Sequence, residues 1–153
     1  MNILPEIAWA FKRKAYVNEQ AFDQEIAAYQ SAILKERARW NASQVVIPAA
    51  AIDVCYEAWI KGKEDLRPNE TLLDEEEAFD EDNGDNGFYQ VEVCARLKAA
   101  NDVHFTALDL MYQLQQQTNN KELGDHIFFE GLTLSQEESF QSDVPLYYLD
   151  CGS

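Results

Sequence analysis

Long apolar runs are missing from this sequence of 153 residues. No stretch approaches the ~20 uninterrupted apolar residues that a membrane-spanning helix requires, and the longest candidate, residues 45–56, contains Pro48 and Asp53. The opening residues Met-Asn-Ile-Leu-Pro-Glu have no basic region leading into an apolar core and no small-residue cleavage site. We therefore expect a protein that does not cross a membrane and, for a complete chain, a cytoplasmic location.

Cysteine is also scarce. The three cysteines, Cys55, Cys94 and Cys151, are an odd number, are widely spaced and include no C-x-x-C pair. The sequence therefore lacks the usual signature of a redox motif or a zinc knuckle. We predict that the three are reduced thiols with no chemical role, and that those in apolar surroundings act as small buried hydrophobic residues.

Recognisable catalytic and metal-binding motifs are absent. The chain has no Gly-x-Ser-x-Gly, glycine-rich phosphate loop, H-E-x-x-H or dinucleotide-binding fingerprint. The acidic run 80–87 resembles a calcium loop in composition, but counting from Asp80 places Gly84 at the fifth position and Val91 at the twelfth, where ligands are needed. We expect no metal and no cofactor, and the absences favour a protein that is not an enzyme.

Basic residues are few beside the acidic ones. The chain has 12 Lys and Arg against 28 Asp and Glu, for a formal net charge of −16. Residues 1–40 hold six basic and five acidic groups, whereas residues 41–153 hold six basic and 23 acidic groups, a net charge of −17. This field repels nucleic-acid phosphates and anionic membranes and attracts basic surfaces. We therefore expect a basic protein partner and no direct contact with nucleic acid or membrane.

The length and the apolar content predict a single globular domain over residues 1–153, because 46% of the residues are hydrophobic and 12% are aromatic. We divide this domain into a helical half over 1–62, an acidic loop over 63–87 and a strand-helix-strand-strand half over 88–153. The predicted fold class is α+β. In it, N-terminal helices pack with a small, mainly antiparallel sheet and one further helix.

Apolar spacing predicts three helices in the first half, over residues 5–17, 19–39 and 48–61. Asn18 interrupts the apolar pattern where an N-cap would begin the second helix. The third prediction depends on a helical face at i, i+3, i+4 and i+7, formed by Ile52, Cys55, Tyr56 and Trp59.

A set of carboxylates from both halves of the chain is interpreted as solvated surface groups: Asp53, Glu57 and Glu92.

The second half has clearer signals. Residues 88–97 alternate between apolar and polar, which predicts a half-buried strand. The sequence from Thr106 to Asp109 resembles a capping box and opens a helix predicted over 107–119. Two runs rich in β-branched and aromatic residues, 126–134 and 144–149, predict two further strands that pair antiparallel.

The leading hypothesis is a non-enzymatic binding protein whose acidic loop engages a basic protein partner. Small size, negative charge and the lack of catalytic motifs are shared by many bacterial immunity proteins, inhibitors and nucleic-acid mimics, although this comparison assigns no residue. The predicted partner-binding residues are the loop carboxylates with two aromatic anchors beside them: Asp74, Glu75, Glu76, Glu77, Asp80, Glu81, Asp82, Asp85, Phe88 and Tyr89.

Two alternatives stay open. The first is a small enzyme or ligand-binding domain with a pocket near His126, where Glu130 and Glu92 would supply further polar groups. The second is a homodimer formed through the apolar stripe, which consists of Phe22, Ile26, Tyr29 and Ile33. Packing of this stripe within its own chain is the competing interpretation.

Overall fold

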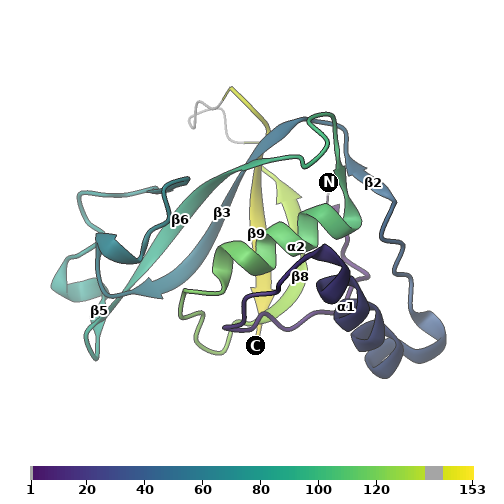
Figure 1. Cartoon of the computed structure of the whole chain (residues 1–153). Coiled ribbons are helices and arrows are strands. Elements are labelled where there is room, and N and C mark those ends of the chain that lie inside the picture. The colour runs from purple at the N-terminus through teal and green to yellow at the C-terminus, as the bar shows by residue number, and fades with distance from the viewer. Residues whose placement is uncertain (1, 137–142) are drawn as a thin grey trace.

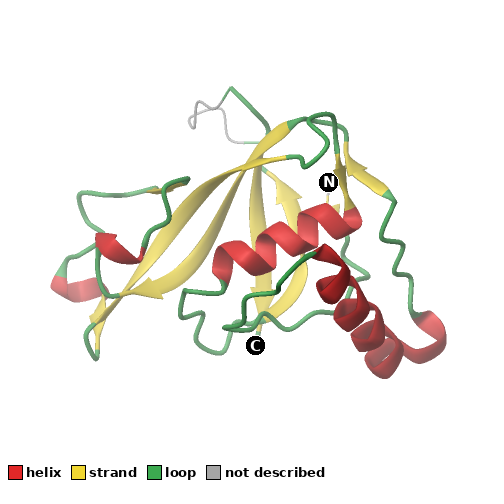
Figure 2. Ribbon diagram, viewed as in Figure 1, coloured by secondary structure: helices red, strands yellow, loops and turns green. Residues whose placement is uncertain are grey.

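A computed structural model describes residues 2–136 and 143–153 of the chain. In these residues the chain forms two α-helices, a seven-stranded sheet and a small two-stranded ribbon (Figures 1 and 2). The elements are β1 (Asn2–Ile3), α1 (Glu19–Leu34), β2 (Val45–Ile47), β3 (Ala51–Ile60), β4 (Glu70–Leu72), β5 (Gly84–Asp85), β6 (Phe88–Lys98), β7 (Phe105–Thr106), α2 (Ala107–Thr118), β8 (Phe128–Leu134) and β9 (Leu146–Gly152). Single turns of 3₁₀ helix cover Lys35–Arg37, Lys63–Asp65 and Glu81–Asn83.

The large sheet has the strand order β1-β8-β9-β3-β6-β4, and β5 also pairs with β6. Strands β3 and β9 run parallel, while the other pairs are antiparallel. Helix α2 crosses one face of this sheet and contacts α1 (Figure 2). The predicted mixture of α and β structure is confirmed. The sheet is larger than predicted and mixed, and two of the three helices expected in the first half are replaced, one by extended chain and one by a strand.

The centre of the sheet is the long antiparallel pair of β3 and β6, which match over ten consecutive residues. The helix predicted over residues 48–61 is therefore wrong. Alternate residues of β3 from Ile52 to Ile60 are buried on the side of the helices. Ile52 and Tyr56 fit both a helical and an alternating pattern, so local spacing alone could not separate the two. Pairing with β6 decides between them, because it satisfies the backbone and buries the alternate side chains.

The helix predicted over residues 5–17 is also wrong, because this segment is extended. Ile7, Trp9 and Phe11 point into the core at alternate positions. Trp9 and Phe11 bond through their backbone to the start of β8: Phe11 N donates to Ile127 O at 2.8 Å, and Phe129 N donates to Trp9 O at 2.8 Å. Ile7 and Phe11 are four residues apart, which fits one face of a helix. The same separation also fits every second inward-facing position of an extended strand.

Helix α1 begins where the sequence predicted. Asn18 Oδ1 accepts a hydrogen bond from Ala21 N at 2.9 Å, which satisfies an otherwise unpaired helical N–H. The helix ends at Leu34, earlier than predicted. Within the apolar stripe, Phe22 and Ile26 are fully buried in the chain's own core, while Ile33 is exposed. The stripe therefore packs internally, and self-association stays a prediction without structural support.

The second half agrees with the sequence more closely. Strand β6 has the predicted alternation, and β8 and β9 pair antiparallel as expected. Helix α2 is capped by Thr106, whose Oγ1 accepts a hydrogen bond from Asp109 N at 3.1 Å. The acidic loop over 63–87 is less uniform than predicted, because it contains β4, β5 and two 3₁₀ turns.

No helix within residues 2–136 and 143–153 is long and apolar enough to cross a membrane.

Cys55 and Cys94 form a disulfide, so the prediction that all three cysteines are reduced is wrong. The two residues lie directly opposite each other in the register of β3 and β6, 39 positions apart in the sequence. Their wide spacing concealed this relation, because only strand pairing brings them together. Cys151 is a free thiol.

We predict that the disulfide contributes roughly 4 kcal/mol to the free energy of unfolding, because it closes a loop of intermediate length in the unfolded chain. Urea unfolding with and without dithiothreitol would measure this difference. The Cys151→Ala variant is the control and should show the same response to the reductant. Equal unfolding midpoints for the oxidised and reduced protein would contradict the prediction.

Candidate functional site

The sheet divides between β3 and β9, and a groove lies at the division. The parallel ladder between the two strands extends from Asp53, opposite Leu146, to Cys55, opposite Tyr148. Beyond this point the strands diverge, as the two arrows in Figure 1 show. The same edge of β3 next pairs at Trp59, where it meets Glu122 of the loop after α2.

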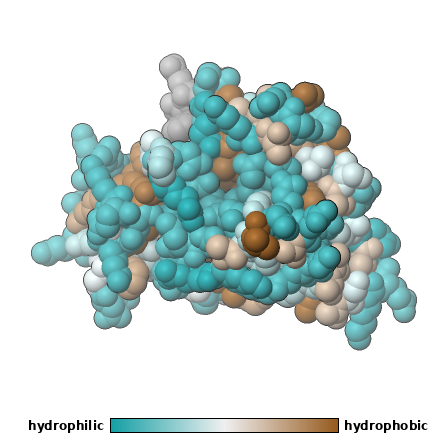
Figure 3. Space-filling model, viewed as in Figure 1, coloured by the Kyte–Doolittle hydropathy of each residue, from teal (hydrophilic) through white to brown (hydrophobic). Residues whose placement is uncertain are grey.

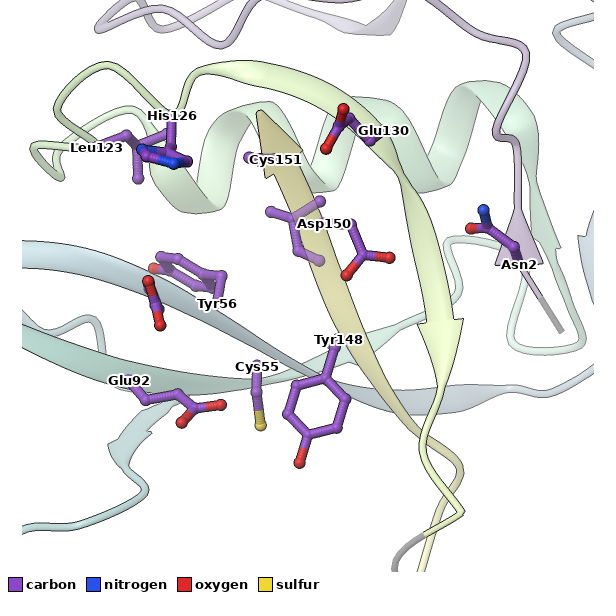
Figure 4. Close-up of a pocket in the computed structure, with 12 residues that line it drawn as sticks. Asn2, Cys55, Tyr56, Glu92, Leu123, His126, Glu130, Tyr148, Asp150 and Cys151 are labelled. Carbon is purple, nitrogen blue, oxygen red and sulfur yellow. The ribbon is translucent and has the colours of Figure 1, made fainter. Parts of the chain in front are cut away.

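The groove has a volume of about 630 Å³, within the range of roughly 300–1,000 Å³ that ligand sites occupy. It opens on the face of the sheet away from α2, which passes behind the strands in Figure 4. Its lining comes from β3, β6, β8, β9, the N-terminus and the loop before β8: Asn2, Cys55, Tyr56, Glu57, Glu92, Leu123, His126, Glu130, Tyr148, Leu149, Asp150 and Cys151.

Three successive cross-strand pairs of β3 and β6 lie on this open face. They are Asp53–Arg96, Cys55–Cys94 and Glu57–Glu92. The first pair is complementary, since Arg96 Nε donates to Asp53 Oδ1 at 2.5 Å. The third places two carboxylates opposite each other at the groove, an arrangement that costs stability in a sheet. Of these three pairs only the first contains a cation, and neither of its residues lines the groove.

Further carboxylates surround the groove. Glu130 and Asp150 come from β8 and β9, and Thr133 Oγ1 donates to Asp150 Oδ2 at 2.5 Å. A cavity of about 180 Å³ shares Glu57 with the groove and adds Asp125. Another, of about 190 Å³, shares Glu92 and adds two carboxylates of the acidic loop.

These three adjoining cavities define what we call the acidic surface. Its carboxylates are Asp74, Glu77, Glu57, Glu92, Asp125, Glu130 and Asp150. In the part of the chain that the structure describes, no Lys or Arg lines any of the three cavities. A lining rich in carboxylates and without Lys or Arg favours a positively charged ligand.

His126 stands at the rim of the groove. It lies on the loop before β8, is largely exposed, and places its Nδ1 2.8 Å from Asp125 Oδ1. The sequence had grouped His126 with Glu130 and Glu92, and the structure brings all three to the groove (Figure 4).

The two cysteines that line the groove offer no reactive thiolate. Cys55 is held in the disulfide. Burial, and then the charges of Asp150 and Glu130, raise the pKa of the Cys151 thiol to about 12, so this group is protonated at neutral pH. Nor do the described residues contain a group of three or more His, Cys, Asp or Glu side chains placed to hold a metal ion.

The predicted partner-binding residues are only partly gathered at this site. Asp74 and Glu77 line the cavity that adjoins the groove, and the remaining loop carboxylates are exposed to solvent. The two predicted aromatic anchors, Phe88 and Tyr89, already contact other side chains of the same chain. Tyr89 packs edge-to-face on Phe79, and the Lys61 ammonium lies 5.4 Å from the centre of the Phe88 ring.

Sequence reasoning missed Asp150 and Tyr148 as groove residues and interpreted Glu57 as solvated helix surface. The alternation of β3 was the available signal, since it puts Asp53, Cys55 and Glu57 on one face. No short-range sequence pattern indicated that β9 would separate from β3 next to these residues.

A buried ion pair holds the loop that closes one end of the groove. Lys121 Nζ lies 2.8 Å from Glu70 Oε1, and both side chains are fully buried. Tyr56 donates its hydroxyl to Glu70 Oε2 at 2.5 Å, and Arg67 N donates to Glu70 Oε1 at 2.6 Å. The loop after α2 is thereby tied to β3 and β4, which places Leu123 and His126 at the groove.

Comparisons with protein-family models, curated proteins and solved structures found no match. The chemistry of the site is therefore inferred from its own residues. They form a concave, negatively charged surface with aromatic and apolar residues beside the carboxylates, which is suited to binding a cationic ligand.

We predict that Glu70→Gln lowers the free energy of unfolding by about 3–5 kcal/mol, because it leaves the Lys121 charge buried without its counter-charge. The double variant Glu70→Gln/Lys121→Met should be more stable than the single variant, since the uncompensated charge is gone. Urea unfolding of the wild type, the single variants Glu70→Gln and Lys121→Met, and the double variant measures the coupling between the two side chains. Simple additivity of two destabilising changes would contradict it.

We also predict a loss of stability above about pH 10 that depends on Tyr56. Burial, and then the neighbouring Glu70 carboxylate, raise the pKa of Tyr56 well above its ordinary value. The unfolded phenol ionises near pH 10, so the contribution is complete below that pH and declines as the pH rises further. Unfolding free energies between about pH 8 and 11 should fall more steeply for the wild type than for Tyr56→Phe. Parallel curves would contradict this assignment.

Proposed function

We propose that this protein is a non-enzymatic binding protein that engages a basic protein partner through its acidic surface. The observation that carries the proposal is the set of adjoining cavities with seven carboxylates and no Lys or Arg in their described lining. Such a surface accelerates encounters with basic proteins and disfavours acidic ones. The acidic loop residues Glu75, Glu76, Asp80, Glu81, Asp82 and Asp85 extend the same negative field.

The side of the molecule that carries α2 shows little sign of an apolar interface. Seen from the side of α2, it is mostly hydrophilic, and hydrophobic residues form only small, scattered groups (Figure 3). Exposed apolar residues such as Val17, Val45 and Val103 are dispersed along the chain.

A finer proposal is a neutralising role, as an immunity protein, an inhibitor or a nucleic-acid mimic. In each role an acidic surface covers the basic surface of a toxin or of a nucleic-acid-binding protein. The site has the charge that this requires.

The cytoplasmic location expected from the sequence stays a proposal, and the Cys55–Cys94 disulfide weighs against it. Cytosolic thiols are kept reduced, whereas disulfides persist in oxidising compartments. The state of this disulfide in the cell, measured by trapping free thiols, would show in which kind of compartment the partner is encountered.

A second candidate is a ligand-binding or enzymatic pocket at His126. It is favoured by one observation: His126, Glu130 and Glu92 line the same groove, and Asp125 lies within hydrogen-bonding distance of the imidazole. Against it stand the exposure of the imidazole and the protonated state of the Cys151 thiol. If the His126→Ala variant keeps full affinity for the partner, partner binding does not depend on this imidazole.

The main test compares two variants that each remove three negative charges. The groove variant is Glu57→Gln/Glu130→Gln/Asp150→Asn, and the loop variant is Glu76→Gln/Glu81→Gln/Asp82→Asn. A basic partner captured from native lysate and purified should bind the groove variant at least about tenfold more weakly than the wild type, and the loop variant less weakly than that. Raising the salt from about 0.05 to 0.2 M should reduce the affinity of the wild type most, because screening acts on the intact charge set.

Thermal melting of both variants is the control for an intact fold. The proposal fails if no salt-sensitive basic partner is recovered. It also fails if the folded groove variant binds the purified partner as tightly as the wild type does.

A further inference from the structure

The groove is bordered by strand edges as well as by carboxylates. Strand β6 pairs with one edge of β3 along its whole length, but β9 pairs with the other edge only as far as Cys55. From there to Gly152, β9 continues with β8 as its sheet partner. The described residues thus leave a short stretch of β3 and the end of β9 facing each other across the groove.

The unpaired position on β3 can be located at Glu57. Asp53 N donates across this edge to Pro145 O at 2.9 Å, and Trp59 N donates across it to Glu122 O at 2.7 Å. Backbone groups of alternate strand residues point to the same edge, so those of Cys55 and Glu57 point there too. Cys55 lies within the ladder with β9, whereas the ladder does not extend to Glu57. The Glu57 N–H and C=O therefore face the groove without a strand partner.

An open strand edge is a template for pairing with another chain, and extended peptides bind many proteins by adding a strand to such an edge. Native sheets usually cover their strand edges. On this edge of β3, β9 covers the residues up to Cys55, and Glu122 covers Trp59. The edge at Glu57 is left open between them, where the sheet forms a concave site. It can accept only a short segment, because Trp59 closes it on one side and Tyr148 on the other.

Charge defines the chemistry of that segment. Glu57 of β3 lies opposite Glu92 of β6 on one side of the groove. Glu130 of β8 and Asp150 of β9 lie on the other side (Figure 4). Alternate side chains of an extended peptide point the same way, roughly 6.6 Å apart. Lys or Arg at alternate positions would therefore direct successive cations toward these carboxylates, while the Tyr148 ring and Leu123 offer contacts to the aliphatic stems.

We propose that the groove binds an extended segment of the partner with Lys or Arg at alternate positions, and that this segment pairs through its main chain with the open edge of β3 at Glu57. The inference rests on the proposed function, since it names how the basic partner is recognised. It adds a requirement that charge attraction does not have: the segment must present free backbone N–H groups.

The test uses two synthetic peptides and the unmodified full chain. One probe is acetyl-Thr-Lys-Thr-Lys-Thr-Lys-amide, and the other has the same sequence with N-methyl groups on alternate residues. Methylation removes backbone donors and keeps every charge. We expect the unmethylated peptide to bind at least tenfold more tightly by calorimetry. We also expect its largest amide shifts in NMR spectra, and new protection from hydrogen exchange, at Glu57 and its neighbours in β3.

Equal affinity of the two peptides would overturn the strand-pairing inference and leave charge-based binding of a basic partner standing. Absence of binding by either peptide, or shifts centred on the acidic loop, would overturn it as well. Discrimination between the peptides, with shifts at Glu57, supports the inference even if no basic partner is recovered from lysate. In that case only the proposed function fails.

Discussion

The architecture depends on the register of one strand pair. Strands β3 and β6 match over ten residues, so every position on one strand assigns its partner on the other to the same face. One face receives the apolar residues from Ile52 to Ile60 and packs under the helices. The other receives the Asp53–Arg96 pair, the disulfide and the Glu57–Glu92 pair. A slip of one residue would exchange the two faces, and the covalent and ionic pairs both oppose it.

Where the sheet divides, this register places Glu57 at the groove. Up to Cys55, β3 is a central strand, because β6 and β9 flank it. Beyond Cys55 it has an open edge, and its outward carboxylate, Glu57, borders a groove. The loop containing Lys121 closes this groove. Because a buried ion pair usually adds little net stability, the bond from Lys121 to Glu70 matters mainly for fixing where that loop lies.

The open face breaks one of the ordinary rules of sheet composition. Opposite charges meet at Asp53 and Arg96, but two carboxylates meet at Glu57 and Glu92, and more carboxylates lie across the groove. Natural sequences tend to break such rules where a site needs a particular charge. The concave shape, the open strand edge and the negative charge coincide at this position, and together they support a binding role more strongly than the net charge does alone.

Local sequence determined the elements whose signals lie within a few residues of one another. Asn18 and Thr106 begin their helices through bonds to the next turn, and the alternation of β6 agrees with its burial. The acidic excess was equally plain. Residues 5–17 and 48–61 were misassigned because a few apolar residues fit both periods, and the contacts that decide come from β8 and β6, far along the chain. The disulfide and the groove were decided by tertiary structure alone, since each depends on strands that are distant in sequence and meet, or separate, only in the folded sheet.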